Sequence, residues 1–294
     1  MATKQEVLTS YDGSVNFLGE NVRRYIGEIL WIEPKSEILQ QYGYDGFIID
    51  YKKSISDKSN IYKCCDGVGS KYNELAGKYF KVIDVIEHPE KDTPKGKIMY
   101  GGIYYLKLQE KESNDILFYE YHSKYESSFP FVAVKFYEKQ KGDYLGKEYV
   151  FADKYLEEIK DVYTGLPITQ KTEQKWKCID LIIEEEFFNY LYILENNKGE
   201  KIGMNQSVLK EKWTGVFYVS EVEKYKKKFG VENFNTIFKG KVKIGMTKEM
   251  CKLSWGEPTD VNKTAVAGKQ TEQWVYGNGN YLYFENNILT AIQN

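Results

Sequence analysis

Residues 80–86 read "FKVIDVI", and a near copy, "WKCIDLI", stands at residues 176–182. Each string has the length of a β-strand and is rich in apolar, β-branched and aromatic residues. Two more pairs of strings occur in the same order along the chain: "YIG" at 25–27 with "YLG" at 144–146, and "YLKLQE" at 105–110 with "YLYILE" at 190–195. These matches predict two β modules in tandem, and chance similarity among short β-rich strings is the alternative.

The chain has 294 residues, which is more than one hydrophobic core usually serves and predicts two or three domains. Tyr, Phe and Trp make up 16% of it, an excess that favours sheets, in which flat rings pack across neighbouring strands. Strand-like runs continue from residue 46 to the string "FPFVAVKFY" at 129–137. They predict a mostly antiparallel first module.

The predicted fold is α+β and rich in β. Two antiparallel β modules, related as a tandem repeat, are followed by a module of helices and a three-stranded sheet. The expected bounds are a loose, polar N-terminus at 1–20, the first β module at 21–138, the second at 139–219 and the α+β module at 220–294.

From residue 220 the sequence has a helical period. In "SEVEKYKKKFG", Ser220 and Glu223 form a capping-box pattern, which predicts that a helix begins at Ser220. The segment "KIGMTKEMCKLSWGEP" at 243–258 predicts a short, bounded helix, because Thr247 can cap its start and Gly256 can end it.

The final segment, "EQWVYGNGNYLYFENNILTAIQ", predicts three antiparallel strands separated by turns rich in Gly and Asn. A two-residue turn at Asn286–Asn287 sets the register of the last hairpin. It places the following residues opposite each other: Phe284 and Leu289, Leu282 and Ala291, Tyr283 and Thr290, Tyr281 and Ile292.

This order of helices, the GMT-opened helix ending in WGEP, the EQWVYG strand and the YLYFENN hairpin resemble the β-lactamase inhibitor protein-like group. That group includes the small lipoprotein of the outer-membrane assembly machinery, the SmpA/OmlA type. The resemblance covers about residues 221–294 and implies a fold, a bacterial source and no activity. The start of the chain has no signal-peptide pattern, so we expect a cytoplasmic protein as written, or an envelope or periplasmic one if a signal peptide was removed.

Four aromatic residues of the predicted C-terminal sheet indicate a binding surface. Tyr281 and Tyr283 share one face, and Trp274 and Tyr276 of the preceding strand are expected to join them. Rigid aromatic side chains offer a large contact area at a small entropic cost, so we expect a protein partner at this face. Packing of the same face on the second β module is the alternative.

Asp84 in "KVIDVI" and Asp180 in "KCIDLI" occupy matching positions inside apolar strands. Burial perturbs carboxyl groups, so the pair marks an alternative site for a small ligand or an enzyme reaction, in a cleft between the β modules. Regular alternation places each Asp on the same face as Val82 or Cys178. A hydrogen bond at a strand edge is therefore the other interpretation.

The sequence carries no pattern of catalytic residues, and we expect neither a metal nor a cofactor. The only histidines are His88 and His122, and neither has a further ligand at metal-binding spacing. His88 is expected in a solvated turn, and a pair of His122 with Ser123 is disfavoured because neighbours on a strand point to opposite faces. Adjacent Cys64 and Cys65 are expected to be reduced, since a bridge between neighbours is strained.

Charge and hydropathy exclude two classes of partner. Forty-one basic and 43 acidic residues give a net charge of -2, which lacks the basic footprint of a nucleic-acid-binding protein. No apolar run has the roughly 18–20 residues that a transmembrane helix needs. The predicted function is that of a non-catalytic binding or structural protein that acts through protein–protein recognition, and the sequence indicates no oligomeric state.

Overall fold

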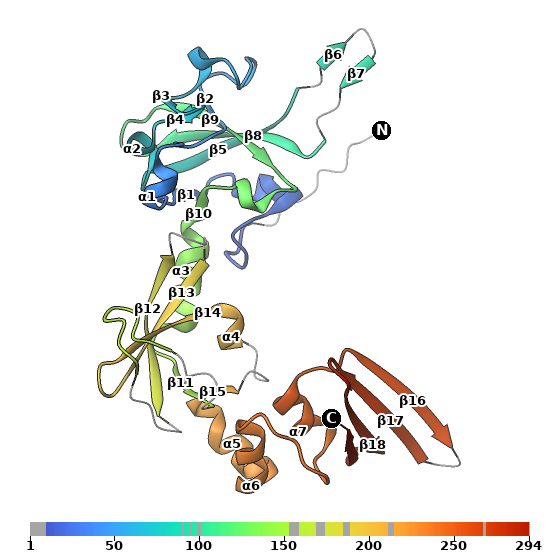
Figure 1. Cartoon of the computed structure of the whole chain (residues 1–294). Helices are drawn as coiled ribbons and strands as arrows, with labels where there is room; N and C mark the ends of the chain where they lie inside the picture. Colours follow the sequence, from blue (N-terminus) through green and yellow to red (C-terminus); the bar gives the residue numbers. More distant parts are fainter. Residues whose placement is uncertain are drawn as a thin grey trace. The chain divides into compact units, whose positions relative to one another are not determined.

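The computed structural model describes residues 10–89, 91–93, 96–98, 101–152, 159–168, 174–184, 189–210, 215–266 and 269–293. The fold is α+β and rich in β, as predicted (Figure 1). Two compact units divide the chain between Asp143 and Tyr144.

The first unit is built on a six-stranded antiparallel sheet in the order β10-β1-β5-β8-β9-β2. Its strands are β1 (Ile29–Ile32), β2 (Phe47–Ile48), β5 (Tyr79–Glu87), β8 (Ile103–Glu110), β9 (Ile116–His122) and β10 (Phe131–Ala133). Two short 3-10 helices, η1 (Gly19–Tyr25) and η3 (Glu126–Ser128), precede β1 and β10. A small hairpin of β6 (Lys91–Thr93) and β7 (Gly96–Ile98) lies between β5 and β8 in sequence.

Between β1 and β5 runs a long segment with short elements of its own. These are α1 (Glu37–Gln40), η2 (Lys58–Asn60), β3 (Cys64–Asp66), β4 (Gly69–Ser70) and α2 (Tyr72–Leu75), together with β2. β3 and β4 pair as a separate two-stranded ribbon.

The second unit contains a five-stranded antiparallel sheet in the order β14-β13-β12-β11-β15. Its strands are β11 (Glu148–Phe151), β12 (Lys175–Glu184), β13 (Asn189–Asn196), β14 (Lys201–Asn205) and β15 (Val216–Tyr218). Helix α3 (Val134–Tyr144) precedes β11, and α4 (Gln206–Lys210) lies between β14 and β15.

Apart from β2, the two sheets have the same strand order. In the first sheet β1 lies between β5 and β10, and in the second sheet β11 lies between β12 and β15. In each sheet, therefore, the first strand along the chain lies between the second strand and the last. The "YIG" and "YLG" strings make equivalent hydrogen bonds to the second strand of their sheets. Gly27 N donates to Val82 O, and Gly146 N donates to Cys178 O, both at 2.8 Å. The tandem arrangement is therefore a property of the fold. Leu108 pairs with Val82 in the first sheet, and Leu194 pairs with Cys178 in the second. Leu108 therefore corresponds to Leu194, which lies one residue after the position that the matching strings give.

A β-bulge interrupts the second strand of both sheets at the same place. The register shifts between Val82 and Asp84 in β5 and between Cys178 and Asp180 in β12. The buried side chains of these strands include Phe80, Val82 and Val85 in β5 and Trp176, Cys178 and Leu181 in β12. In a regular strand, two residues three positions apart point to opposite faces, so they cannot both enter the core. The extra residue of a bulge brings both side chains to the same face.

The expectation of a loose N-terminal segment was wrong for the residues that the structure describes. Residues 10–20 were expected to be loose, but Tyr11 is 1% exposed, and Asn16 binds β10 through both ends of its amide. Its Nδ2 donates to Phe131 O and its Oδ1 accepts from Ala133 N, each at 2.8 Å.

The strand predicted at 129–137 ends at Ala133, where α3 begins. Phe136, Gln140 and Tyr144 are buried at a spacing of four residues, which is a helical period within an apolar run that also fits a strand. α3 precedes β11 as η1 precedes β1, and the boundary between the two compact units falls at the end of this helix.

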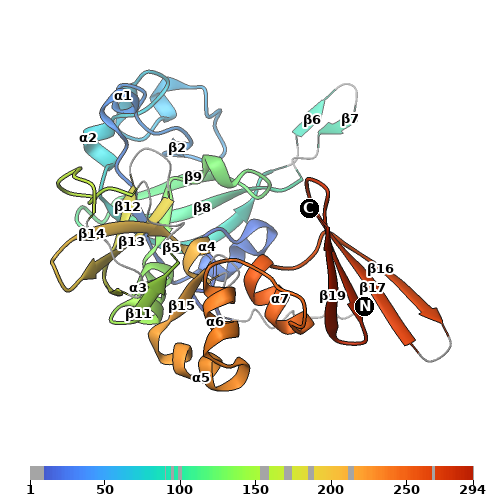
Figure 2. The same ribbon diagram turned by 60° about the horizontal axis from the view of Figure 1, so that its bottom comes forward.

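The C-terminal module contains three helices and a four-stranded sheet in the order β16-β17-β18-β19 (Figure 2). Its elements are α5 (Val219–Phe229), α6 (Val231–Phe238), α7 (Lys248–Trp255), β16 (Asp260–Val266), β17 (Lys269–Tyr276), β18 (Asn280–Glu285) and β19 (Ile288–Gln293). The sequence predicted three strands, because β16 is polar and lacks a strand-like apolar pattern.

The start of α5 differs from the prediction, and that of α7 agrees with it. α5 begins at Val219 after Tyr218, which makes no capping bond, so Ser220 lies inside the helix and the capping-box prediction was wrong. In α7, Thr247 Oγ1 accepts from Met250 N at 3.3 Å, and Gly256 follows the last helical residue.

The last hairpin keeps only part of its predicted register. Phe284 pairs with Leu289 as expected, but Leu282 pairs with Ile292 and Tyr283 with Ala291, because the register shifts between Tyr283 and Phe284. The shift lets Leu289 and Ile292, three positions apart, both pack into the core cluster of this module.

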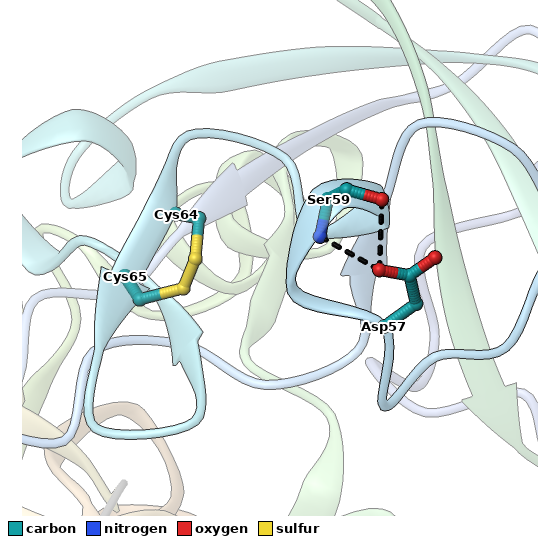
Figure 3. The surroundings of a disulfide bond; sticks show 4 residues. All are labelled: Asp57, Ser59, Cys64 and Cys65. Atoms are coloured by element: carbon teal, nitrogen blue, oxygen red, sulfur yellow. Dashed lines mark hydrogen bonds between the residues drawn. A yellow bond between two sulfur atoms is a disulfide. The ribbon is translucent and has the colours of Figure 1, made fainter.

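The four cysteines fall into two classes. Cys64 and Cys65 are joined by a disulfide in β3, which corrects the expectation of reduced thiols (Figure 3). Cys178 and Cys251 are free and buried. Burial raises the pKa of the Cys178 thiol to about 11 and that of Cys251 to about 12. Since the thiolate is the reactive form, both should be inert while the protein is folded.

Titration with a thiol reagent at pH 8 tests this assignment. Protein purified without reductant should show no rapidly reacting thiol when folded, two thiols in denaturant, and four after reduction in denaturant. Four thiols in denaturant without prior reduction would contradict the disulfide.

The Thr247 cap predicts a stability effect. Thr247→Ala removes the side-chain acceptor for Met250 N and should lower the free energy of unfolding by about 1 kcal/mol. Thr247→Ser keeps the acceptor and serves as the control. Urea unfolding followed by tryptophan fluorescence measures the difference, and equal midpoints for all three proteins would show that the bond contributes nothing.

Candidate functional site

The C-terminal sheet has an inner face that packs on the helices. Trp274, Leu282, Phe284 and Leu289 are buried there, in one cluster with residues of α5, α6 and α7. Trp274 Nε1 donates to Glu272 Oε2 at 2.9 Å. These contacts make Trp274 a core residue.

Tyr276 also lies on the inner side. Its hydroxyl donates to Gly256 O at 3.0 Å, and its ring meets Trp255 edge-on with centroids 5.3 Å apart. Burial raises the pKa of the Tyr276 phenol, as expected for a group that is a neutral donor. Tyr276 therefore ties the end of α7 to β17.

Tyr281 and Tyr283 lie on the opposite, outer face of the sheet and are partly exposed. Strand pairing sets this division, since Trp274 lies opposite Leu282 and Gln273 opposite Tyr283. The sequence interpretation that joined all four aromatic residues in one surface was wrong. Trp274 and Tyr276 face the helices, and only the two tyrosines of β18 are available to a partner.

A polar ladder crosses the outer face, with one residue from each of the four strands. Asn262 Nδ2 donates to Gln273 Oε1 at 3.1 Å, and Gln273 Nε2 donates to the Tyr283 hydroxyl at 3.0 Å. That hydroxyl donates to Gln293 Oε1 at 2.7 Å. We call Asn262, Gln273, Tyr283 and Gln293 the outer ladder. Such a chain of bonds fixes the direction of each donor and acceptor.

The charged side chains that the structure describes at the outer face are acidic. Asp260 and Glu285 occupy outer positions, and no basic residue does among those whose side chains the structure describes. Lys248 lies on the inner side, paired with Glu272 at 2.9 Å. The outer face thus combines neutral amides and phenols with two carboxylates.

Asp84 and Asp180 have the same structural role in the two repeats. Asp84 Oδ1 accepts from Val85 N and Asp180 Oδ1 from Leu181 N, both at 2.8 Å. Each side chain satisfies the amide of the residue that the bulge turns into the core. The expectation that each Asp shares a face with Val82 or Cys178 was wrong, because the bulge interrupts the alternation.

Glu120 and Tyr105 form a buried acid–phenol pair that contacts both histidines of the chain. The sequence did not indicate this cluster. His122 Nε2 lies 3.0 Å from Glu120 Oε1, and the Tyr105 hydroxyl donates to Glu120 Oε2 at 3.2 Å. The ring of His88, expected in a solvated turn, lies 5.1 Å from that of Tyr105.

Ser123 does not complete a nucleophile site with His122. Its Oγ is buried and has no hydrogen-bond partner among the described residues, whereas the His122 side chain is 32% exposed. Nothing in this arrangement pairs a nucleophile with a base.

No family model, curated protein or solved structure matches this chain. Within the described ranges, no group of three or more His, Cys, Asp or Glu side chains is placed to hold a metal ion. In the same residues, no helix has both the length and the apolar character required to span a membrane. Function must therefore be argued from the chain's own surfaces.

The role of the two aspartates predicts matched effects on stability. Asp84→Ala and Asp180→Ala each remove one hydrogen bond at a bulge and should each lower the free energy of unfolding by about 1 kcal/mol. Asn keeps an acceptor oxygen, so the two Asn variants should lose less. If the Ala variants unfold at the wild-type denaturant concentration, the bonds do not hold the bulges.

Proposed function

We propose that this protein is a non-catalytic binding protein that recognises a protein partner through the outer face of its C-terminal sheet. The outer ladder is the observation that carries the proposal. It holds Tyr283 and its amide neighbours in fixed orientations, with Tyr281 on the same face, on a sheet whose other face forms the core. A surface ordered before binding loses little entropy when a partner docks.

The side chains of this face suit a protein more than a small molecule. Tyr and Asn side chains dominate recognition surfaces that combine apolar contact with hydrogen bonds. The donors and acceptors of this face come from all four strands.

We also propose that residues 221–294 are a module of the β-lactamase inhibitor protein-like or SmpA/OmlA type, placed in the cell envelope. The three helices and antiparallel sheet support the first part, although the sheet has a fourth strand. The Cys64–Cys65 disulfide supports the second part, because disulfides persist in oxidising compartments.

Site-specific photo-crosslinking tests the binding face. A photoreactive residue at position 281 should yield one discrete adduct in envelope extracts. The same residue at 231, where Val231 is 59% exposed on α6, should not. The adduct identifies the partner, which is then purified for affinity measurements.

Affinity measurements with the purified partner test the proposal. The double variant Tyr281→Ala, Tyr283→Ala should bind it at least about tenfold more weakly, while Val231→Ser binds like the wild type. Tyr283→Phe keeps the ring, removes the ladder hydroxyl and should give an intermediate loss. Equal affinities for the wild type and a folded double variant would exclude this face.

A further inference from the structure

The two β repeats differ most in the connection between their first and second strands. In the first repeat this connection runs from residue 33 to 78, and in the second from 152 to 174. We call residues 33–78 the inserted segment. It supplies β2 as a sixth strand and carries α1, η2, the β3–β4 ribbon and α2. Among the described residues, the connection at 152–174 adds no strand to the second sheet, so the strand order common to both repeats does not require β2.

The inserted segment is held in place by close backbone contacts. Tyr44 N donates to Ser70 O at 2.9 Å and Ser70 N donates to Tyr44 O at 2.8 Å. Side chains cannot be accommodated at the crossing, since a Cβ at Gly43 would clash with Ser70 O and one at Gly69 with Tyr44 O. The ribbon therefore lies directly against residues 43–46.

Two further features support the loop between β2 and the ribbon (Figure 3). Asp57 Oδ1 accepts from both the amide and the hydroxyl of Ser59 and caps η2. Asn60, which is 1% exposed, accepts from Asp50 N and donates to Asp50 O and Ser54 O. The disulfide lies at the base of the ribbon, where Cys64 pairs with Ser70.

These elements enclose a pocket of about 440 Å³. Its apolar lining residues are Phe47, Ile48, Ile55, Ile61 and Val68. Val68, on the ribbon's turn, is 77% exposed, and Ile55 is 37% exposed. A volume of this size and an apolar lining with few polar groups are typical of sites for small molecules.

One carboxylate stands at the pocket wall. A Cβ on Gly69 would lie 2.6 Å from Asp45 Oδ1, which places this oxygen beside the backbone of the lining residue Gly69. Asp45 makes no hydrogen bond through its side chain and no ion pair with any residue that the structure describes. Lys35 is near enough for its charge to interact with that of Asp45, but it forms no ion pair with the carboxylate. Its Nζ instead donates to Gly43 O at 2.6 Å and lies over the Tyr44 ring.

We propose that this pocket binds a small organic amine with an apolar body, with the ammonium at Asp45 and the body among Phe47, Ile48 and Val68. An unpaired carboxylate beside an apolar cavity attracts a cation that brings its own apolar surface. The site is independent of the outer face of the C-terminal sheet.

Lys58, on η2, lines the same pocket as Asp45 and carries the opposite charge. A pocket whose selectivity depended on Lys58 would prefer an anion. The Lys58 ammonium ends a long, flexible, exposed side chain that can turn towards solvent. The Asp45 carboxylate is on a short side chain next to the fixed crossing of the ribbon. The structure therefore assigns the selectivity of the pocket to Asp45.

Two probes with one aromatic body and opposite charges test the proposal. Calorimetric titration of the full-length protein with 2-phenylethylamine should show binding at least about tenfold tighter than with 3-phenylpropanoate. Asp45→Asn should remove this difference, whereas Lys58→Gln should leave the amine's affinity unchanged or stronger. Val68→Ser, at an exposed position, should weaken the amine without changing the melting temperature.

Three results would each overturn the assignment. They are no binding of the amine to the wild type at millimolar concentration, binding of the carboxylate at least as tight as that of the amine, and an unchanged affinity of the amine in Asp45→Asn. Since Asp45 is exposed and makes no side-chain bond within the described structure, Asp45→Asn should fold, and Asp45→Ser provides a second variant of the same kind.

Discussion

Both β repeats depend on burying two apolar side chains that stand three positions apart in one strand, Val82 with Val85 and Cys178 with Leu181. A regular strand would turn one member of each pair to solvent. The bulge restores both to the core, and the carboxylate of Asp84 or Asp180 binds the displaced amide. The same device recurs in the last strand of the chain, where a register shift lets Leu289 and Ile292 share the inner face.

The sequence predicted elements that depend on local chemistry. The repeated strings located the second and third strands of both sheets, and Thr247 and Gly256 bounded α7 correctly. Ambiguity arose where one apolar run satisfies two periods, as at residues 129–144, where a strand was expected and α3 begins at Val134.

Features that depend on register could not be predicted in the same way. A bulge changes the face of every residue beyond it, so the facing of Asp84 and the pairing of Tyr283 were assigned incorrectly. The outer ladder joins side chains from four strands, and the pocket joins residues from Asp45 to Gly69. Neither set has a recognisable spacing in the sequence, because only the folded backbone brings its members together.

The repeated scaffold suggests where function lies. The parts common to both repeats, including the bulge aspartates, are explained by packing and hydrogen bonding. Within the described residues, two parts have no counterpart: the inserted segment of the first repeat, with its pocket, and the C-terminal sheet, with its outer ladder. We propose that the unrepeated parts carry recognition and that the two repeats hold them in place.

An experimentally determined structure tests the duplication most directly. β5 and β8 should superpose on β12 and β13 with Asp84 on Asp180, and each carboxylate should accept a hydrogen bond from the amide of the next residue. Regular alternation through either strand, or a superposition that places Asp84 elsewhere than on Asp180, would contradict it.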